Sequence, residues 1–257
     1  MEMKDLKVAI IQSKLYWENK EENLKMFSAK ISKINESVDL IVLPEMFTTG
    51  FTMRPKMFAE GMSGSTMNWM KKTAREKNSS VIGSFICEEN KKFYNRLALV
   101  FANGTFQIYD KRHLFSMGNE QQHYQAGEER MIAEINGWKI CPFICYDLRF
   151  PIWSRNTKEK PYDVLIYIAN WPEKRKHPWK TLLLARAIEN QAYVIGLNRV
   201  GEDGNGISHS GDSAIVNSKG EIISTIIANL ESTEIISLNY QELHEFRNIF
   251  PVLNDAD

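Results

Sequence analysis

The sequence predicts an α/β fold in which two mixed β-sheets face each other and helices cover the outer faces. Short, β-branched apolar runs of the kind that form buried strands recur along the chain. Stretches with apolar residues at helical spacing separate some of these runs, whereas Asn-Gly turn signals join others directly into hairpins. A doubly wound sheet would alternate every strand with a helix, so the hairpins favour two mixed sheets instead.

The first half of the chain uses both kinds of connection. Residues 6–11 form an apolar, β-branched run, and the charged stretch 18–33 carries apolar residues at helical spacing. Asn103-Gly104 is the strongest short hairpin signal in the sequence. We expect further strands at 38–43, 81–86, 93–101 and 105–109 and a further helix at 66–77.

The second half repeats this pattern and ends in a tail. A second hairpin is expected around Asn136-Gly137 and a third around the turn 218–220. No linker, change of composition or internal repeat divides the chain, so residues 1–257 are predicted to form a single domain. Residues 242–257 form a C-terminal tail that needs another surface to pack against. The expected strands lie at 131–135, 138–144, 164–168, 192–197, 214–216, 221–227 and 235–238, with a helix at 182–190.

Composition and charge exclude several classes of protein. The 257 residues include 32 Lys or Arg and 32 Asp or Glu, so the net charge is zero and argues against a nucleic-acid partner. Three cysteines without a Cys-x-x-Cys pair argue against a disulfide scaffold or a thiolate zinc cluster. No apolar run reaches the roughly 18 residues of a membrane span, and we expect no secretory signal. We therefore expect a cytoplasmic protein with no membrane partner.

A first candidate functional residue is Glu45, in the sequence Leu43-Pro44-Glu45-Met46-Phe47. It directly follows an expected buried strand, and Pro44 ends the strand pairing. An acidic side chain at a strand end is more often simply solvated. The apolar neighbours, however, would raise the pKa of the carboxyl group and suit it to act as a general base near neutral pH.

A second candidate is Lys111, in the sequence YDKRHLF after an expected hairpin strand. Such a polar loop is usually solvated. A lysine that points inward instead supplies a fixed ammonium group that stabilises negative charge during acyl transfer. Glu120 follows a little further on, in a polar and aromatic loop with the sequence GNEQQHY.

A third candidate is Cys145, in the sequence PFICYDLRFP. Most lone cysteines are small buried hydrophobic residues, and Cys87 and Cys141 are assigned to that class. Cys145 instead ends an apolar strand where a new segment begins. A nucleophile at a strand-to-helix corner is lifted out of the sheet, and the backbone N–H of the next residue, Tyr146, becomes free to bind an oxyanion.

Together, and in this order, these motifs resemble those of the nitrilase (carbon–nitrogen hydrolase) superfamily, and the resemblance covers almost the whole chain. LIVLPEMFTTGF is similar to the glutamate motif, YDKRHLF to the lysine motif and FICYDLRFP to the cysteine motif. The resemblance implies that Glu45 is the general base, Lys111 the cation and Cys145 the nucleophile that forms a thioester. It also matches Glu120 to a second glutamate found in many members, and it implies no metal and no organic cofactor.

Three stretches resemble one branch of the superfamily, the bacterial omega-amidases of 2-oxo-dicarboxylic acid monoamides: EMFTTGF, YDKRHLF with GNEQQHYQAG, and NWP with ARAIENQAYVIGLNRVG. This implies hydrolysis of 2-oxoglutaramate or 2-oxosuccinamate to the dicarboxylic 2-oxo acid and ammonia. It also implies an α-β-β-α sandwich that dimerises into an α-β-β-α-α-β-β-α stack. The tail at 242–257 would then lie at the interface of a homodimer or higher homo-oligomer.

Residues for substrate recognition are harder to single out. Trp171 follows the expected strand 164–168 and is a candidate wall of the substrate pocket, although ordinary core packing is an equally good explanation. A cation would suit the carboxylate of a 2-oxo acid. The sequence does not choose among the basic candidates, which are Arg54, Lys174, Arg175 and Lys176.

Two other classes of function stay open on the sequence. The same triad serves an N-carbamoyl amine hydrolase, an aliphatic amidase or a true nitrilase. A non-catalytic binding module on the same fold is a further alternative, although all three triad positions are filled. Ammonia release from a panel of amides, nitriles and carbamoyl compounds distinguishes these alternatives.

Overall fold

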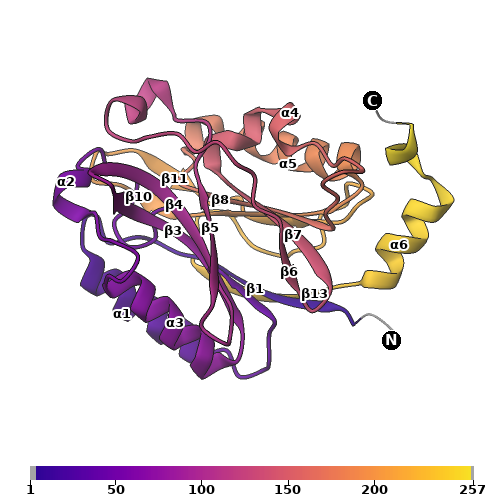
Figure 1. Cartoon of the computed structure of the whole chain (residues 1–257), viewed down its shortest axis with the longest axis horizontal. Helices are drawn as coiled ribbons and strands as arrows, with labels where there is room; N and C mark the ends of the chain where they lie inside the picture. The colour runs from indigo at the N-terminus through magenta and orange to yellow at the C-terminus, as the bar shows by residue number, and fades with distance from the viewer. Residues whose placement is uncertain (1–3, 256–257) are drawn as a thin grey trace.

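Two β-sheets lie face to face between two layers of helices in the computed structural model, which describes residues 4–255 (Figure 1). The strands of the first sheet run in the order β13-β1-β2-β3-β4-β5. They are β1 (Leu6–Gln12), β2 (Leu40–Val42), β3 (Ser80–Glu89), β4 (Lys92–Val100), β5 (Phe106–Asp110) and β13 (Ser232–Leu238). Helices α1 (Lys20–Ser32) and α3 (Ser65–Lys77) cover the outer face of this sheet.

The strands of the second sheet run in the order β12-β9-β8-β7-β6. They are β6 (Ala133–Ile135), β7 (Trp138–Ile144), β8 (Val164–Ala169), β9 (Tyr193–Asn198) and β12 (Ala214–Val216). Helices α4 (Pro151–Ser154) and α5 (Lys176–Asn190) cover its outer face. Each sheet combines parallel pairs, such as β1 with β2 and β7 with β8, and antiparallel pairs, such as β1 with β13 and β6 with β7. The predicted α/β class and the pair of mixed sheets are therefore confirmed.

The side chains of β1 show how the core is divided. Val8 and Ile10 pack into the core between the two sheets, whereas Ala9 and Ile11 pack against the helical layer of α1 and α3. All four side chains are fully buried. Successive side chains of a strand point to opposite faces, so a strand that lies between two apolar layers is apolar at every position rather than at every second one.

The two Asn-Gly hairpins form where the sequence predicts them. Asn103-Gly104 lies in the turn between β4 and β5, and Asn136-Gly137 lies in the turn between β6 and β7. Gly104 and Gly137 have φ angles of +86° and +87°. Glycine reaches this left-handed region without steric cost, so the local residues are sufficient to specify both turns.

The strand expected at 221–227 is absent, so that prediction was wrong. A single bridge between Val216 and Ile222 forms in this region. The side-chain amide of Gln12 donates to the carbonyl oxygens of Ile227 and Leu230, at 3.0 and 2.7 Å. Within the segment, the backbone N–H of Thr225 donates to the carboxylate of Glu234 at 2.7 Å. Side chains therefore pair with backbone groups that a neighbouring strand would otherwise take, and the segment runs as a loop.

Smaller elements complete the chain. A separate ribbon of β10 (Val200–Glu202) and β11 (Ser208–Ser210) is not predicted by the sequence, nor are the helices α2 (Pro55–Phe58) and α6 (Tyr240–Ile249). The short 3-10 helices are η1 (Ser116–Gly118), η2 (Glu120–Gln122), η3 (Cys145–Arg149), η4 (Glu173–Arg175) and η5 (Val252–Asn254). Within residues 4–255, no helix has the length and apolar character needed to span a membrane.

Candidate active site

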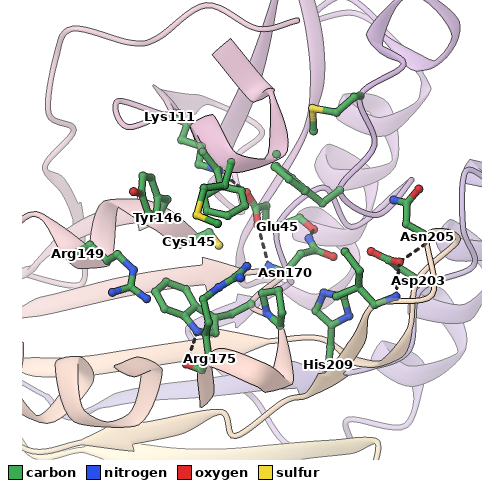
Figure 2. Close-up of a pocket in the computed structure, with 18 residues that line it drawn as sticks. Glu45, Lys111, Cys145, Tyr146, Arg149, Asn170, Arg175, Asp203, Asn205 and His209 are labelled. Atoms are coloured by element: carbon green, nitrogen blue, oxygen red, sulfur yellow. Dashed lines mark hydrogen bonds and ion pairs between the residues drawn. The ribbon is translucent and has the colours of Figure 1, made fainter. Parts of the chain in front are cut away.

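A cavity of about 420 Å³ opens among the segments that directly follow β2, β5, β7 and β8 (Figure 2). The predicted site residues that line it are Glu45, Lys111, Cys145, Tyr146 and Trp171. Glu120 lies behind Lys111 and is fully buried. The fold thus brings together residues that lie up to 126 positions apart in the sequence, because the strands that precede them end on the same side of the two sheets.

Hydrogen bonds from three segments of the chain hold the carboxylate of Glu45. Its Oε1 accepts from Asn95 Nδ2 at 2.8 Å and from Lys111 Nζ at 2.9 Å. Its Oε2 accepts from the backbone N–H of Asn170 at 2.7 Å. The next residue, Met46, has a φ of +42°, in the left-handed region that residues with a side chain rarely adopt. The chain therefore turns sharply at this point, and the carboxylate is locked against the cavity wall.

The ammonium group of Lys111 lies between two carboxylates. Nζ is 2.9 Å from Glu45 Oε1, and 3.0 and 2.9 Å from Oε1 and Oε2 of Glu120. It also lies 5.0 Å from the ring centre of Phe51, which is a cation–π distance. Burial by itself would lower the pKa of Lys111, but the two carboxylates outweigh burial and hold the pKa above its ordinary value. Lys111 is therefore a charged group at the cavity wall.

Glu120 contacts the lysine and the backbone of its own loop. Its Oε2 accepts from the backbone N–H of Phe115 at 2.6 Å in addition to the bond from Lys111. Burial raises the pKa of Glu120, and the ammonium group of Lys111 opposes that shift. Because Glu120 does not line the cavity, its contacts fix the position of Lys111 rather than reach into the open space.

Cys145 lies at the corner between β7 and η3, as the sequence predicts. Its φ is +47°, a strained backbone conformation of the kind that collects at functional sites. Cys145 is partly exposed, whereas Cys87 and Cys141 are buried. The backbone N–H of Tyr146 belongs to the first turn of η3, where N–H groups have no carbonyl partner within the helix. The corner therefore presents a thiol and a backbone N–H next to each other.

The protonation state of the Cys145 thiol follows from its surroundings. Burial raises the pKa of the thiol well above its ordinary value, and the carboxylate of Glu45 acts in the same direction, whereas Lys111 opposes the shift. At neutral pH the thiol is therefore protonated. Because the thiolate is the reactive form, attack on a carbonyl group needs a base that takes the proton, and Glu45 is the carboxylate next to the thiol.

Two arginines place positive charge in the same cavity. The guanidinium group of Arg149, in η3, lies 5.0 Å from the ring centre of Trp171, and that of Arg175, in η4, lies 5.1 Å from the ring centre of Phe115. Both arginines line the cavity, and Figure 2 shows them on the same side of Cys145. Arg149 is not singled out by the sequence, although its position four residues after Cys145 within the cysteine motif was an available signal.

The other basic candidates lie outside the cavity lining. Arg54 binds Glu18, with 2.6 Å between Nη1 and Oε2, and half of its side chain is exposed. Lys174 and Lys176 are exposed and line a neighbouring surface groove. Of the four basic residues that the sequence leaves open, Arg175 is therefore the one that borders the cavity.

Trp171 combines the two explanations that the sequence leaves open. It lines the cavity, and its ring also packs on Trp179 with 5.5 Å between ring centres. Its indole Nε1 donates to the backbone carbonyl of Arg175 at 2.7 Å. This hydrogen bond fixes the orientation of the ring and ties η4, which carries Arg175, to the end of β8.

Two asparagines that hold Glu45 are missed by the sequence reasoning. Asn95 lies in β4 and is fully buried, and Asn170 donates from Nδ2 to the backbone carbonyl of Glu45 at 2.6 Å. A buried polar side chain needs a hydrogen-bond partner. Asn95 lies next to another polar residue, Arg96, in β4, so the sequence does not show that Asn95 is buried or which group it meets.

The unpredicted β10–β11 ribbon completes the rim of the cavity. His209 and Asp203 both line it. Burial lowers the pKa of His209 to about 4, so this imidazole is neutral at pH 7. Within residues 4–255, no group of three or more His, Cys, Asp or Glu side chains is arranged to hold a metal ion.

Comparison with known proteins places this geometry in a family. The family model for carbon-nitrogen hydrolases matches residues 7–248. The omega-amidase YafV of Escherichia coli (strain K12) is 45% identical over 255 residues, which cover 99% of this chain and 98% of the relative. A 2-oxoglutaramate amidase of Bacillus subtilis (strain 168) is 32% identical over 251 residues, which cover 96% of each chain.

A solved structure agrees with the sequence comparison. XC1258 from Xanthomonas campestris, a CN-hydrolase superfamily protein with an arsenic adduct in its active site, shares the fold with a TM-score of 0.97. It is 38% identical, and the match covers 99% of this chain and 98% of that chain. The match to the family model, the two relatives and the shared fold extend over nearly the whole chain, and they show that it belongs to the carbon–nitrogen hydrolase family of the nitrilase superfamily.

Proposed function

We propose that this protein is an omega-amidase, which hydrolyses the terminal amide of a 2-oxo-dicarboxylic acid monoamide such as 2-oxoglutaramate or 2-oxosuccinamate. One observation carries the proposal: a thiol, a carboxylate and an ammonium group meet in a cavity that also contains two guanidinium groups. The first three groups suit amide hydrolysis through a thioester, and guanidinium groups suit a carboxylate. The relatives named omega-amidase and 2-oxoglutaramate amidase support the same substrate class.

The first half of the reaction makes the thioester. Glu45 takes the proton of the Cys145 thiol, and the thiolate attacks the amide carbon while the carbonyl electron pair moves onto the oxygen. The ammonium group of Lys111 and the backbone N–H of Tyr146 stabilise this oxyanion. Glu45 then gives the proton to the amide nitrogen, the C–N bond breaks and ammonia leaves. The acyl group stays on the sulfur.

The second half of the reaction releases the acid. Glu45 takes a proton from a water molecule, and the resulting hydroxide attacks the thioester carbon. The same two donors hold the oxyanion a second time. The C–S bond breaks, the sulfur recovers a proton from Glu45, and the dicarboxylic 2-oxo acid leaves. One carboxylate thus serves as base and acid in both halves, which agrees with its fixed contacts to Asn95 and Asn170.

Glu120 acts through Lys111. The contacts of the Lys111 ammonium group to Glu45 and to both oxygens of Glu120 fix that group at the cavity wall, where its positive charge stabilises the substrate oxyanion. The two carboxylates also keep the pKa of Lys111 raised, so the group is a permanent cation when the oxyanion forms. A preorganised charge of this kind needs no reorganisation at the moment of reaction.

Arg149 and Arg175 are the groups that we assign to the 2-oxo carboxylate. Both are partly exposed in the cavity, and Trp171 and Phe115 hold their guanidinium groups in place. An arginine pairs with a carboxylate through parallel hydrogen bonds. The cavity of about 420 Å³ has the size of a small-molecule site. The same two charges disfavour the α-ammonium group of glutamine, because like charges in a partly buried site repel each other.

Ammonia release from a panel of compounds tests the proposal. The panel contains 2-oxoglutaramate, glutamine, propionamide, a simple nitrile and an N-carbamoyl amine, all at one pH, with Cys145→Ala as the matched control. We expect kcat/KM for 2-oxoglutaramate to exceed that for propionamide by about 10²-fold or more, because propionamide has no carboxylate to pair with the arginines of the cavity. Equal values for these two compounds would refute the omega-amidase assignment but would not contradict hydrolysis through a thioester. No release from any compound would favour a binding module.

We also propose a homodimer in which the outer helices of the second sheet meet. Ile152 in α4, Ile188 in α5 and Ile249 at the end of α6 are 91, 55 and 82% exposed, and Phe250 is 58% exposed. Large apolar side chains that are exposed in a single chain are often covered by a partner in an assembly. Light scattering on the eluted protein should give twice the mass of the chain, and Ile152→Glu should shift it towards the monomer. A monomeric wild-type protein would refute this assembly.

A further inference from the structure

The buried carboxylate of Asp147 has no part in the reaction steps above, although it lies two residues after Cys145. Its Oδ2 accepts from the Tyr109 hydroxyl at 2.7 Å and from the backbone N–H of Ile144 at 3.1 Å. Its Oδ1 accepts from the backbone N–H of His113 at 2.9 Å and lies 2.7 Å from His113 Nδ1. The side chain is fully buried and does not line the cavity. Any effect on the reaction is therefore transmitted by these partners.

The partners of Asp147 flank two of the proposed catalytic residues. Tyr109 lies two positions before Lys111, and His113 lies two positions after it. Ile144 directly precedes Cys145. One carboxylate therefore joins the segment that carries the ammonium group to the corner that carries the thiol. These segments belong to different sheets, because β5 is in the first sheet and β7 is in the second.

The donors of this carboxylate are themselves held in place. The His113 ring stacks on Phe150, with 3.7 Å between ring centres and 6° between planes, and its edge meets Trp153. The indole Nε1 of Trp153 donates to the Tyr109 hydroxyl at 3.1 Å. Side chains fixed by packing and by further hydrogen bonds are what an accurate site needs around its reacting groups.

The corner at Cys145 needs such support because its backbone is strained. A φ of +47° is strained for a residue with a side chain and persists only where surrounding contacts enforce it. The bond from the Ile144 N–H to the Asp147 carboxylate closes a loop around Cys145. The same carboxylate anchors this loop to the lysine segment, so the strained corner and the ammonium group are held by one side chain.

We infer that Asp147, with His113 as its donor, is the positioning residue that holds the Cys145 thiol in register with the Lys111 ammonium group. The inference rests on the proposed function, because it assigns these two groups to one acyl-transfer step. It predicts an effect on the rate of thioester formation rather than on substrate binding. The hydrogen bonds of the Asp147 side chain go to Tyr109, His113 and Ile144 and not to the arginines that we assign to the substrate carboxylate. KM should therefore change less than kcat.

Asp147→Asn is the first variant, because asparagine has the shape of aspartate but replaces one accepting oxygen with an NH₂ donor. Each carboxylate oxygen accepts from one backbone N–H, that of Ile144 or that of His113. Whichever way the asparagine amide turns, its NH₂ group therefore faces a backbone N–H. We expect kcat for 2-oxoglutaramate to fall by about 10²-fold, the loss typical of a reacting group displaced by about 1 Å, with KM changed by less than about threefold.

Asp163→Asn is the matched control. Asp163 is also buried and accepts a backbone N–H of β7, that of Lys139 at 3.0 Å, but at the end of the strand remote from Cys145. It also binds Arg247 at 2.7 Å. A purely structural effect would lower the melting temperature of both variants and spare kcat in both. An equal loss of kcat in Asp147→Asn and Asp163→Asn would overturn the inference.

A readout that does not depend on the physiological amide separates this inference from the proposed function. The activated ester p-nitrophenyl acetate acylates the nucleophile and releases a burst of nitrophenol. Asp147→Asn should slow the burst at least about tenfold, and Asp163→Asn should leave it unchanged. A normal burst in the wild type without hydrolysis of 2-oxoglutaramate would refute the omega-amidase assignment only. An unchanged burst in Asp147→Asn would overturn the positioning role only.

If Asp147→Asn does not fold, two substitutions at His113 test the positioning role instead. His113→Asn keeps an N–H donor near the position of Nδ1, whereas His113→Phe keeps the stacking on Phe150 and loses the donor. We expect a burst rate close to the wild type for His113→Asn and a fall of about tenfold for His113→Phe, the effect of one lost hydrogen bond to a charged group. Equal rates in the two variants would overturn the inference.

Discussion

Replacement of Glu120 by glutamine tests whether a carboxylate that does not line the cavity controls the reaction. In the wild type, Lys111 Nζ lies 3.0 and 2.9 Å from the two oxygens of Glu120, and Oε2 also accepts the N–H of Phe115. Glutamine fills the same volume. Its amide oxygen can take the place of Oε2 and keep both bonds there. Its NH₂ group then faces the ammonium group at the position of Oε1, so a donor meets a donor.

The expected loss follows from these contacts. Lys111 loses one charge-assisted hydrogen bond, and such bonds contribute about 1.5–3 kcal/mol. If the whole loss falls on the transition state, the rate drops by about 10- to 160-fold. The carboxylate of Glu45 becomes the sole negative partner of Lys111 among the groups that contact it here.

Ammonia release from 2-oxoglutaramate measures the effect, with kcat and KM determined separately. Gln121→Ala is the matched control, because Gln121 is an exposed neighbour in the same 3-10 turn. We expect the control to keep wild-type kcat and Glu120→Gln to lose most of it with a smaller change in KM. A Glu120→Gln protein with kcat within about twofold of the wild type, well inside the expected loss, would refute the reasoning that Glu120 sets the position of Lys111.

Three further outcomes are expected. Glu45→Gln should lower ammonia release by about 10²–10⁴-fold because the proton acceptor is lost, and near-normal activity would rule out Glu45 as the base. Iodoacetamide should label Cys145 before the buried Cys87 and Cys141, whose pKa values burial raises to about 11. Substrate should protect Cys145 from labelling. The labelling rate of Cys145 should increase above neutral pH, because the pKa of its thiol is also raised. Peptide mapping that finds either buried cysteine labelled first contradicts the assignment. Arg149→Ala should lower kcat/KM for 2-oxoglutaramate at least about tenfold and leave propionamide unaffected; equal losses for both compounds would indicate a structural role.

Much of the fold could be predicted because it depends on neighbours in the sequence. The Asn-Gly turns at 103–104 and 136–137 specify their hairpins locally. The prediction of a strand at 221–227 was wrong because the structure of this segment depends on residues that are distant in the sequence. Its residues have the composition of a strand, but side chains take its backbone groups: the amide of Gln12, more than 200 residues away, binds the carbonyl group of Ile227, and Glu234 binds the N–H of Thr225.

The proposed reacting groups could be predicted as well, because Glu45 and Cys145 each follow or end an apolar strand and Lys111 directly follows a hairpin strand. The structure places the three side chains in one cavity. Their partners could not be predicted in the same way. Asn95 lies beside Arg96 in β4, and no local pattern shows that its amide meets Glu45, 50 positions earlier.

The basic residues also show the difference between what the sequence specifies and what tertiary contacts specify. Arg54 and Arg175 are equivalent candidates in the sequence, yet Arg54 binds Glu18 and Arg175 lines the cavity. By itself, the sequence determined the strands, the turns and the types of reacting group, because hydrophobic periodicity and turn chemistry act over a few residues. Only the tertiary structure decided which side chains meet across the two sheets, which charges face the cavity and how Asp147 links Lys111 to Cys145. These distances depend on how segments far apart in the chain pack, and no short stretch of sequence contains that information.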